Sequence, residues 1–178
     1  MRTPRCTIDS SCIIALDHLN LLPNLSFLFS HVLVPKSVRE DLFKRRATKD
    51  RLQSLFDSYA FFERCDGYER GTVDFLLAER DRQGMKDRGE VEAVVQASQF
   101  GAMVIVDDPW GRKLAARHGL DRHGTIWILE RFFRLGLISA SHLRDSFVRL
   151  LDRGIRLPRP AVDRLLVDIG EPPLAPHQ

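Results

Sequence analysis

Short apolar segments alternate with amphipathic ones along this chain. The apolar segments are typical of buried strands and occupy residues 3–8, 31–34, 59–64 and 102–106. Apolar residues recur with helical spacing at 10–19, 25–29, 37–56, 69–82, 90–100, 111–118 and 125–135. Strands and helices that alternate through short connections predict right-handed crossovers, with helices on both faces of one sheet. We therefore expect an α/β fold, a three-layer α/β/α sandwich around a mainly parallel central sheet.

The C-terminal part of the chain carries no further strand pattern. Residues 139–170 predict two helices on either side of 154–158, and residues 171–178 have no periodicity. The whole chain of 178 residues has the length of one domain. We expect a domain over residues 1–138, a helical extension over 139–170 packed on that domain, and a frayed tail.

Composition and charge narrow the class of protein. The chain is 44% apolar and 29% charged, which is typical of a globular protein rather than a disordered one. Its 27 basic and 24 acidic residues give a net charge of +3, an excess too small to identify an anionic partner. No apolar run approaches the roughly 18 residues of a membrane helix. Three cysteines without CxxC spacing exclude a disulfide framework. We expect a cytoplasmic protein with no membrane segment.

Acidic residues follow the predicted strands. Asp9 comes after the first strand, and Asp107 and Asp108 come after the strand at 102–106. Ligands of parallel α/β sheets bind beyond the carboxyl ends of the strands, where these carboxylates are expected to meet.

Two more acids lie on predicted helices. With Val38 taken as inward, Asp41 falls roughly 60° away and borders the core, whereas Glu40 falls roughly 200° away and faces solvent. By the same reasoning Glu90 shares the apolar face of its helix, and Glu92 points outward. A carboxylate at the edge of a core needs a compensating charge.

These acids in one cleft would repel one another, and Mg²⁺ or Mn²⁺ would relieve the repulsion because both ions prefer carboxylate and water oxygens. Each acid also fits a structural role on its own. Those roles are helix capping by Asp9 and by Asp108, a capping box of Asp87 with Glu90, and an ion pair of Asp41 with Lys44 or Arg45. Their joint placement at one sheet edge favours the metal site.

Five segments carry a resemblance to a known family. Residues 8–16 (IDSSCIIAL), 34–42 (VPKSVREDL), 89–93 (GEVEA), 104–108 (VIVDD) and the pair Gly124–Thr125 resemble, in order, the acidic segments and Gly-Thr turn of the PIN domain. The resemblance covers residues 3–138 and is closest to the VapC-like branch of bacterial and archaeal toxin–antitoxin pairs.

This resemblance implies a Mg²⁺- or Mn²⁺-dependent endoribonuclease that hydrolyses RNA phosphodiester bonds. The family pattern assigns the catalytic and metal-binding carboxylates to Asp9, Asp41, Glu90 and Asp107, with Asp108 as second choice because it is the better helix cap. The family usually carries Glu at the position of Asp41. The branch also implies a small antitoxin partner and a homodimer. The residues considered for such interfaces are Phe132, Phe133, Leu135, Leu137, Ile138 and Phe61–Phe62, although apolar periodicity favours core packing for most.

Substrate contacts require cations and hydroxyls near the acids. Arg112 and Lys113 are the candidates for phosphate contacts, although a solvated helix face would carry the same charges. Ser10 and Thr125 would orient a carboxylate or a water molecule, and Trp110 is more typical of packing than of base stacking. The alternative function is a catalytically silent PIN-like module that binds RNA or a protein through the same cleft.

Overall fold

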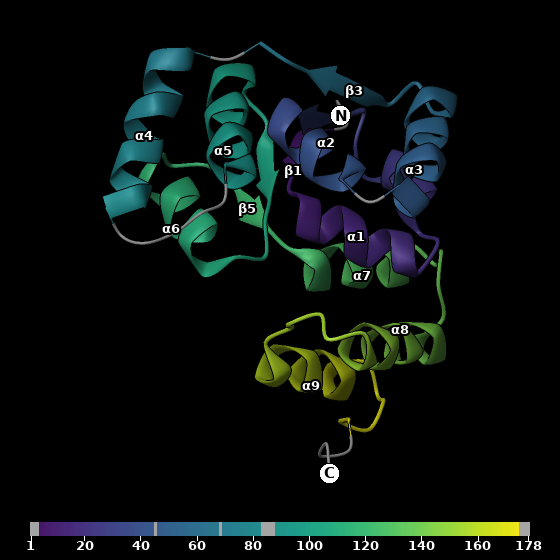
Figure 1. Cartoon of the computed structure of the whole chain (residues 1–178). Helices are drawn as coiled ribbons and strands as arrows, with labels where there is room; N and C mark the ends of the chain where they lie inside the picture. The colour runs from purple at the N-terminus through teal and green to yellow at the C-terminus, as the bar shows by residue number, and fades with distance from the viewer. Residues whose placement is uncertain (1–3, 45, 68, 83–87, 175–178) are drawn as a thin grey trace.

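The computed structural model describes residues 4–44, 46–67, 69–82 and 88–174. Within these residues one sheet runs through the centre of the molecule (Figure 1). Its strands lie in the order β3-β2-β1-β4-β5, and every neighbouring pair is parallel. The strands are β1 (Arg5–Ile8), β2 (His31–Pro35), β3 (Phe62–Cys65), β4 (Met103–Ile105) and β5 (Arg122–His123).

Helices connect the strands and continue beyond the sheet. They are α1 (Ser10–His18), the 3₁₀ helix η1 (Leu22–Phe27), α2 (Lys36–Phe43), α3 (Arg46–Ser58), α4 (Arg70–Arg82), α5 (Gly89–Phe100), α6 (Pro109–Arg117), α7 (Thr125–Arg134), α8 (Ala140–Asp152) and α9 (Arg159–Asp168). The helix predicted at 37–56 is two helices. Helix α2 ends at Phe43, and the N–H of its C-cap residue Lys44 bonds back only three residues, to the Asp41 carbonyl. The helix predicted at 25–29 is the 3₁₀ helix, which begins earlier and holds Pro23 in its first turn, where proline is tolerated.

The strands bury side chains on both faces of the sheet. On β2, Val32 and Val34 face a core shared with α1, α7, α8 and α9, whereas Leu33 faces a second core with α4, α5 and α6. On β4, Ile105 and Val104 divide between the two cores in the same way. This alternation follows from the two-residue period of a strand and places a helical layer on each face. The predicted α/β/α sandwich is confirmed.

Helix α5 is the most enclosed helix of the second layer. It packs on β1, β2 and β4 and also contacts α2, α4 and α6. Every residue from Gly89 to Ala97 is consequently buried. Glu92, predicted to point outward, is only 1% exposed. That prediction was wrong because it assumed one solvent-facing side, and this stretch of α5 has none.

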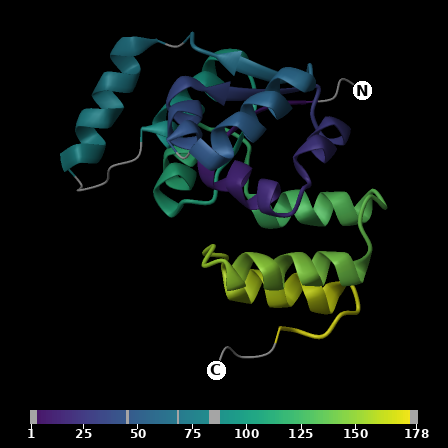
Figure 2. The same cartoon turned by 45° about the vertical axis from the view of Figure 1, so that its right-hand side comes forward.

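Helices α8 and α9 lie side by side below α7 (Figures 1 and 2). Their apolar residues, including Phe147 and Leu166, join the core that contains α1 and α7. Phe132 and Ile138 are buried in the same core, whereas Leu135 is 48% exposed. Across the described residues, no helix combines the length and apolar character that a membrane span requires.

Candidate active site

A cavity of about 700 Å³ opens beyond the carboxyl ends of β1 and β4. Four of the acids singled out in the sequence line it, although they come from three separate parts of the chain. The described lining residues are Asp9, Ser10, Ser11, Ile14, Glu90, Asp107, Asp108, Pro109, Ile155, Arg156, Leu157 and Pro158. The parallel topology explains the meeting of Asp9 with Asp107, because β1 and β4 are adjacent strands that end at the same edge.

Asp9 is both a helix cap and a cavity residue. It is the N-cap of α1, and its Oδ2 accepts hydrogen bonds from the Ser11 backbone N–H at 3.2 Å and from the Ser11 hydroxyl. The Ser10 hydroxyl lies 3.4 Å from the other carboxylate oxygen. The side chain is only 2% exposed. These hydrogen bonds stabilise the ionised carboxylate and fix its direction at the cavity wall.

Asp107 is held by the turn that starts α7. Its Oδ1 accepts from the Thr125 backbone N–H at 2.9 Å, and its Oδ2 accepts from the Thr125 hydroxyl at 2.6 Å. A Cβ atom at residue 124 would lie 2.3 Å from Oδ1, so only glycine leaves room for the carboxylate. The Gly124–Thr125 pair therefore positions Asp107.

The buried Cys12 of α1 contacts Asp107. Its Sγ donates to Asp107 Oδ2 at 3.3 Å. Burial, followed by the negative charges of Asp107 and Asp9, raises the pKa of the Cys12 thiol well above its ordinary value. The thiol is therefore neutral at pH 7 and acts as a hydrogen-bond donor.

Glu90 reaches the same cavity from the first turn of α5 and is 7% exposed. Helix α6 approaches it closely at Gly111, where a Cβ atom would lie 3.3 Å from Glu90 Oε2 and 2.8 Å from a Val106 methyl carbon. Asp108 is the N-cap of α6 and accepts from the N–H groups of Trp110 at 2.7 Å and Gly111 at 3.2 Å. Asp87, the other half of the suggested capping box, lies outside the described residues.

Asp41 is not among the described residues that line the cavity. It lies in the last turn of α2 and forms an ion pair with Lys44, as the structural alternative proposed. Glu40 faces solvent as predicted and pairs with Lys36 at 3.8 Å. The assignment of Asp41 as a metal ligand stays a prediction.

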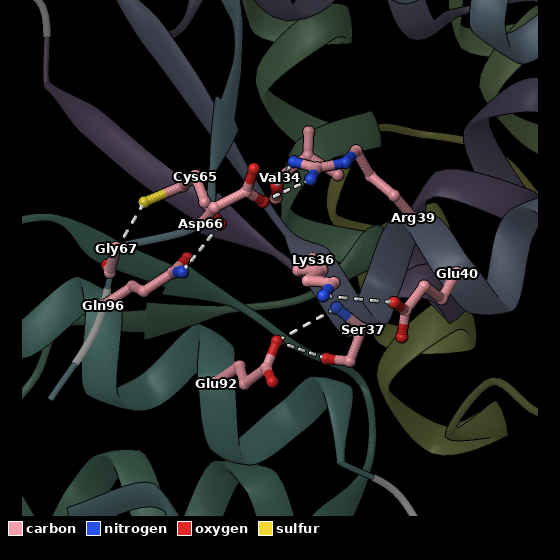
Figure 3. A network of polar contacts seen from close by, with 10 residues as sticks. All are labelled: Val34, Lys36, Ser37, Arg39, Glu40, Cys65, Asp66, Gly67, Glu92 and Gln96. Atoms are coloured by element: carbon pink, nitrogen blue, oxygen red, sulfur yellow. Dashed lines mark hydrogen bonds and ion pairs between the residues drawn. The ribbon is translucent and has the colours of Figure 1, made fainter. Parts of the chain in front are cut away.

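Glu92 has a structural role that the sequence did not indicate. Its Oε2 accepts from the Ser37 backbone N–H at 3.0 Å and from the Ser37 hydroxyl at 2.6 Å (Figure 3). Its Oε1 accepts from Arg88 Nε at 2.8 Å. Helix α2 starts after Pro35 without a side-chain cap of its own, so Glu92 supplies a negative charge at its N-terminus from α5. This contact fixes α2 against the helix that carries Glu90.

The predicted phosphate contacts Arg112 and Lys113 occupy different surroundings. Arg112 donates to the Val106 carbonyl at 3.2 Å and lines a neighbouring cavity of about 270 Å³ that shares Asp107 with the first. Lys113 is exposed and is not among the described residues that line either cavity. Trp110 is 8% exposed and packs in the second core. Among the described residues that line the acidic cavity, Arg156 is the cation, and the sequence analysis did not single it out.

The chemistry of the cavity suits a hard divalent cation. Its acidic wall offers carboxylate oxygens, the donors that Mg²⁺ and Mn²⁺ prefer. Among the described residues, no group of three or more His, Cys, Asp or Glu side chains is already gathered around one point. Mg²⁺ does not need such a cage, because proteins usually bind it through one or two carboxylates together with waters and substrate phosphates. The donor set therefore fits these ions.

Comparison with known proteins identifies a family. A family model described as a PIN domain matches residues 5–171. No curated protein matches the sequence. The matched segment contains every strand of the sheet and extends through α8 and α9.

Proposed function

This chain belongs to the PIN-domain family, and we propose that it is a Mg²⁺- or Mn²⁺-dependent endoribonuclease. PIN domains are generally nucleases, which gives the class of reaction. One observation supports the proposal of a metal-dependent endoribonuclease: the acids that follow β1 and β4, together with Glu90 of α5, line one cavity. A carboxylate wall would repel an RNA phosphate unless a cation lay between them.

Asp9, Glu90 and Asp107 are the proposed metal-binding residues, with Asp108 as the second choice beside Asp107 and Asp41 as the fourth acid of the family pattern. A bound divalent ion lowers the pKa of its water ligand and neutralises charge on the phosphate. The reaction is hydrolysis, in which a P–O bond of the RNA backbone breaks and water supplies the new P–O bond.

The hydroxyl groups around the cavity hold the carboxylates rather than attack the substrate. Ser11 donates to Asp9 and Thr125 donates to Asp107, so both acids keep one orientation during turnover. Ser10 is close enough to Asp9 to assist in the same way. Arg112, which donates to the Val106 carbonyl and lines the neighbouring cavity, is the residue we propose for contact with a flanking phosphate.

The test is cleavage of a structured RNA by the purified chain in the presence of Mg²⁺ or Mn²⁺. Asp9→Asn and Glu90→Gln should each reduce the rate by at least about 100-fold, the upper end of effects seen when even a partner of a metal ligand is lost. Glu63→Gln is the matched control, because Glu63 is an exposed acid on β3. Circular dichroism verifies that each variant is folded. Wild-type rates in both cavity variants would show that these acids do not form the site.

A second candidate function is a silent PIN-like module that binds RNA or a protein. The placement of Asp41 favours it, because the fourth acid of the family pattern is paired with Lys44 and is not among the described lining residues. Binding of RNA without cleavage at millimolar Mg²⁺ or Mn²⁺ would support this module over the nuclease.

We further propose that the nuclease is the toxin of a toxin–antitoxin pair. The support is the resemblance of its acidic segments to the VapC-like branch, whose members pair with a small antitoxin and commonly dimerise. Expression of the wild type in bacterial cells should then arrest growth, and expression of Asp9→Asn should not.

A further inference from the structure

The acidic cavity has one wall that does not come from the sheet domain. Ile155, Arg156, Leu157 and Pro158 form this wall, and all four belong to the connection between α8 and α9. Figure 2 shows this connection on the side of the molecule where α1 and α6 begin. Residues near the C-terminus therefore face Asp9, near the N-terminus, across the cavity.

The connection is fixed in place by contacts at both of its ends. Gly154 adopts φ +74° and lets the chain turn after α8, and the Ile155 N–H then donates to the Leu150 carbonyl at 3.0 Å. Leu157 is 8% exposed and packs in the core. On α8, Arg149 donates to the His18 carbonyl at 3.0 Å, which ties the helix to α1. The wall is thus part of the folded structure.

Four arginines lie in or beside this connection, and the structure gives them different roles. Arg149 and Arg153 both contact His18 at the end of α1. Burial and the charge of Arg153 lower the pKa of His18, so the neutral ring accepts the Arg153 hydrogen bond. Arg159 pairs with Asp163 at 3.1 Å within α9. Arg156 lines the acidic cavity.

Arg156 does not neutralise the acids that it faces. Its side chain is exposed and makes no hydrogen bond or ion pair with another described residue. An arginine that is paired with a carboxylate frequently bonds it through two parallel N–H groups, and Arg156 makes no such contact. The guanidinium of Arg156 instead keeps its donors available for a ligand. A phosphate, with its negative oxygens, is the group that this planar donor fork matches.

We propose that Arg156 binds a phosphate group of the RNA strand on which the cavity acts, so that the α8–α9 connection forms the substrate-binding wall opposite the acids. This inference rests on the proposed nuclease function and adds a positioning residue to it. Arg156 holds one phosphate while Asp9, Glu90 and Asp107 act on the scissile one. Ile155 and Leu157, on either side of it, form the apolar part of that wall.

The test measures RNA binding separately from cleavage. A labelled single-stranded oligoribonucleotide is titrated with the full chain in the Asp9→Asn background, in Mg²⁺ and at several salt concentrations. Arg156→Gln should weaken binding about tenfold, the lower range for a hydrogen bond to a charged group, because the contact is solvent-exposed. It should also reduce the salt dependence by about 0.7, the value for one phosphate contact on a single strand. Arg156→Lys should recover part of the affinity.

Arg164→Gln is the matched control, since Arg164 is an exposed cation on α9 that is not among the described lining residues. It removes the same charge and should change affinity less than twofold, about the effect of a distant surface charge. Equal binding and equal salt dependence for Arg156→Gln and Arg164→Gln would overturn the assignment. Faster cleavage by Arg156→Gln in the otherwise wild-type chain would overturn it too, because Arg156 would then obstruct the cavity.

The two proposals fail in different ways. If the wild type cleaves RNA and Arg156→Gln binds and cleaves like it, the nuclease function stands and only the role of Arg156 is rejected. If the wild type neither binds nor cleaves RNA, both proposals are rejected.

Discussion

Replacing Gly124 by alanine tests how Asp107 is held. The new Cβ atom would lie 2.3 Å from Asp107 Oδ1 and 3.3 Å from the Val106 carbonyl oxygen. Ordinary van der Waals contact begins at 3.4 Å, so the carboxylate must move by about 1 Å. That displacement stretches the 2.9 Å hydrogen bond from the Thr125 N–H beyond the range of a hydrogen bond.

The cost follows from what is lost. A hydrogen bond to a charged group contributes about 1.5–3 kcal/mol, and overpacking at a closely packed position costs about 1–3 kcal/mol. Because Asp107 is only half-buried and water replaces part of the lost bond, we expect Gly124→Ala to lower the free energy of unfolding by about 2–4 kcal/mol. For a chain of this length that corresponds to a fall in Tm of roughly 5–12 °C. Thr125→Val, which removes only the hydroxyl bond, should cost about 1–2 kcal/mol.

Urea unfolding followed by circular dichroism measures this difference. Gly71→Ala is the control, because Gly71 lies in α4 with nothing within 4 Å of the added Cβ. It should leave stability unchanged or raise it by up to about 1 kcal/mol, the helix propensity gained. RNA cleavage by Gly124→Ala should fall by about 10–100-fold, as when a partner of a metal ligand is lost. If Gly124→Ala unfolds within about 0.5 kcal/mol of the wild type, the typical effect of a harmless surface change, Asp107 is not held against this turn.

Two further predictions concern the acids and the thiols. Asp41→Asn should reduce the rate of RNA cleavage at least tenfold, while Glu40→Gln should leave it within twofold. The Asp41–Lys44 ion pair does not prevent metal binding, because a surface i,i+3 pair contributes only about 0.2–0.5 kcal/mol. Wild-type activity in Asp41→Asn would show that only the acids lining the cavity bind the metal ion. Burial raises the pKa of all three buried cysteines, so their contribution to stability is complete below the unfolded value of about 8.5 and is lost as the pH rises above it. Urea unfolding at pH 7.5 and 9.5 should show lower stability at the higher pH, and a rise would contradict this sign.

Four strands of the sheet were predictable, because β1 to β4 each coincide with a short apolar run in the sequence. Strand β5 (Arg122–His123) was not predicted, because its two residues are polar and form no such run. The same pattern placed Asp9 and Asp107 at one edge, since each acid ends such a run and adjacent parallel strands end together. The positions at which helices end were harder to predict from the sequence. The break between α2 and α3 falls in the polar stretch 44–51 (KRRATKDR), where no apolar pattern shows how the chain turns.

Glu92 shows why the position of a residue around a helix does not always predict whether its side chain is buried. The phase of Glu90 was informative because that side chain is buried and reaches the cavity. Glu92 lies roughly 200° around the same helix and is buried as well, since α2 covers the side of α5 that a two-layer packing would leave in solvent. Apolar periodicity predicts one buried face of a helix, and it does not predict that neighbouring helices will bury the other faces as well.

The position of Arg156 at the cavity could not be predicted from the sequence for a different reason. The pattern at 139–170 predicts two helices, yet it does not determine on which side of the domain their connection lies. That side is set by contacts between residues far apart in the sequence, such as Arg149 with the His18 carbonyl. The segment contains several arginines, and no feature of the sequence distinguishes the one that lines the cavity. The fold distinguishes these arginines: Arg149 and Arg153 contact His18 of α1, whereas Arg156 lines the cavity. Arg149 is not among the described lining residues, yet a substitution that frees α8 from His18, such as Arg149→Gln, should weaken RNA binding because it releases the wall that carries Arg156.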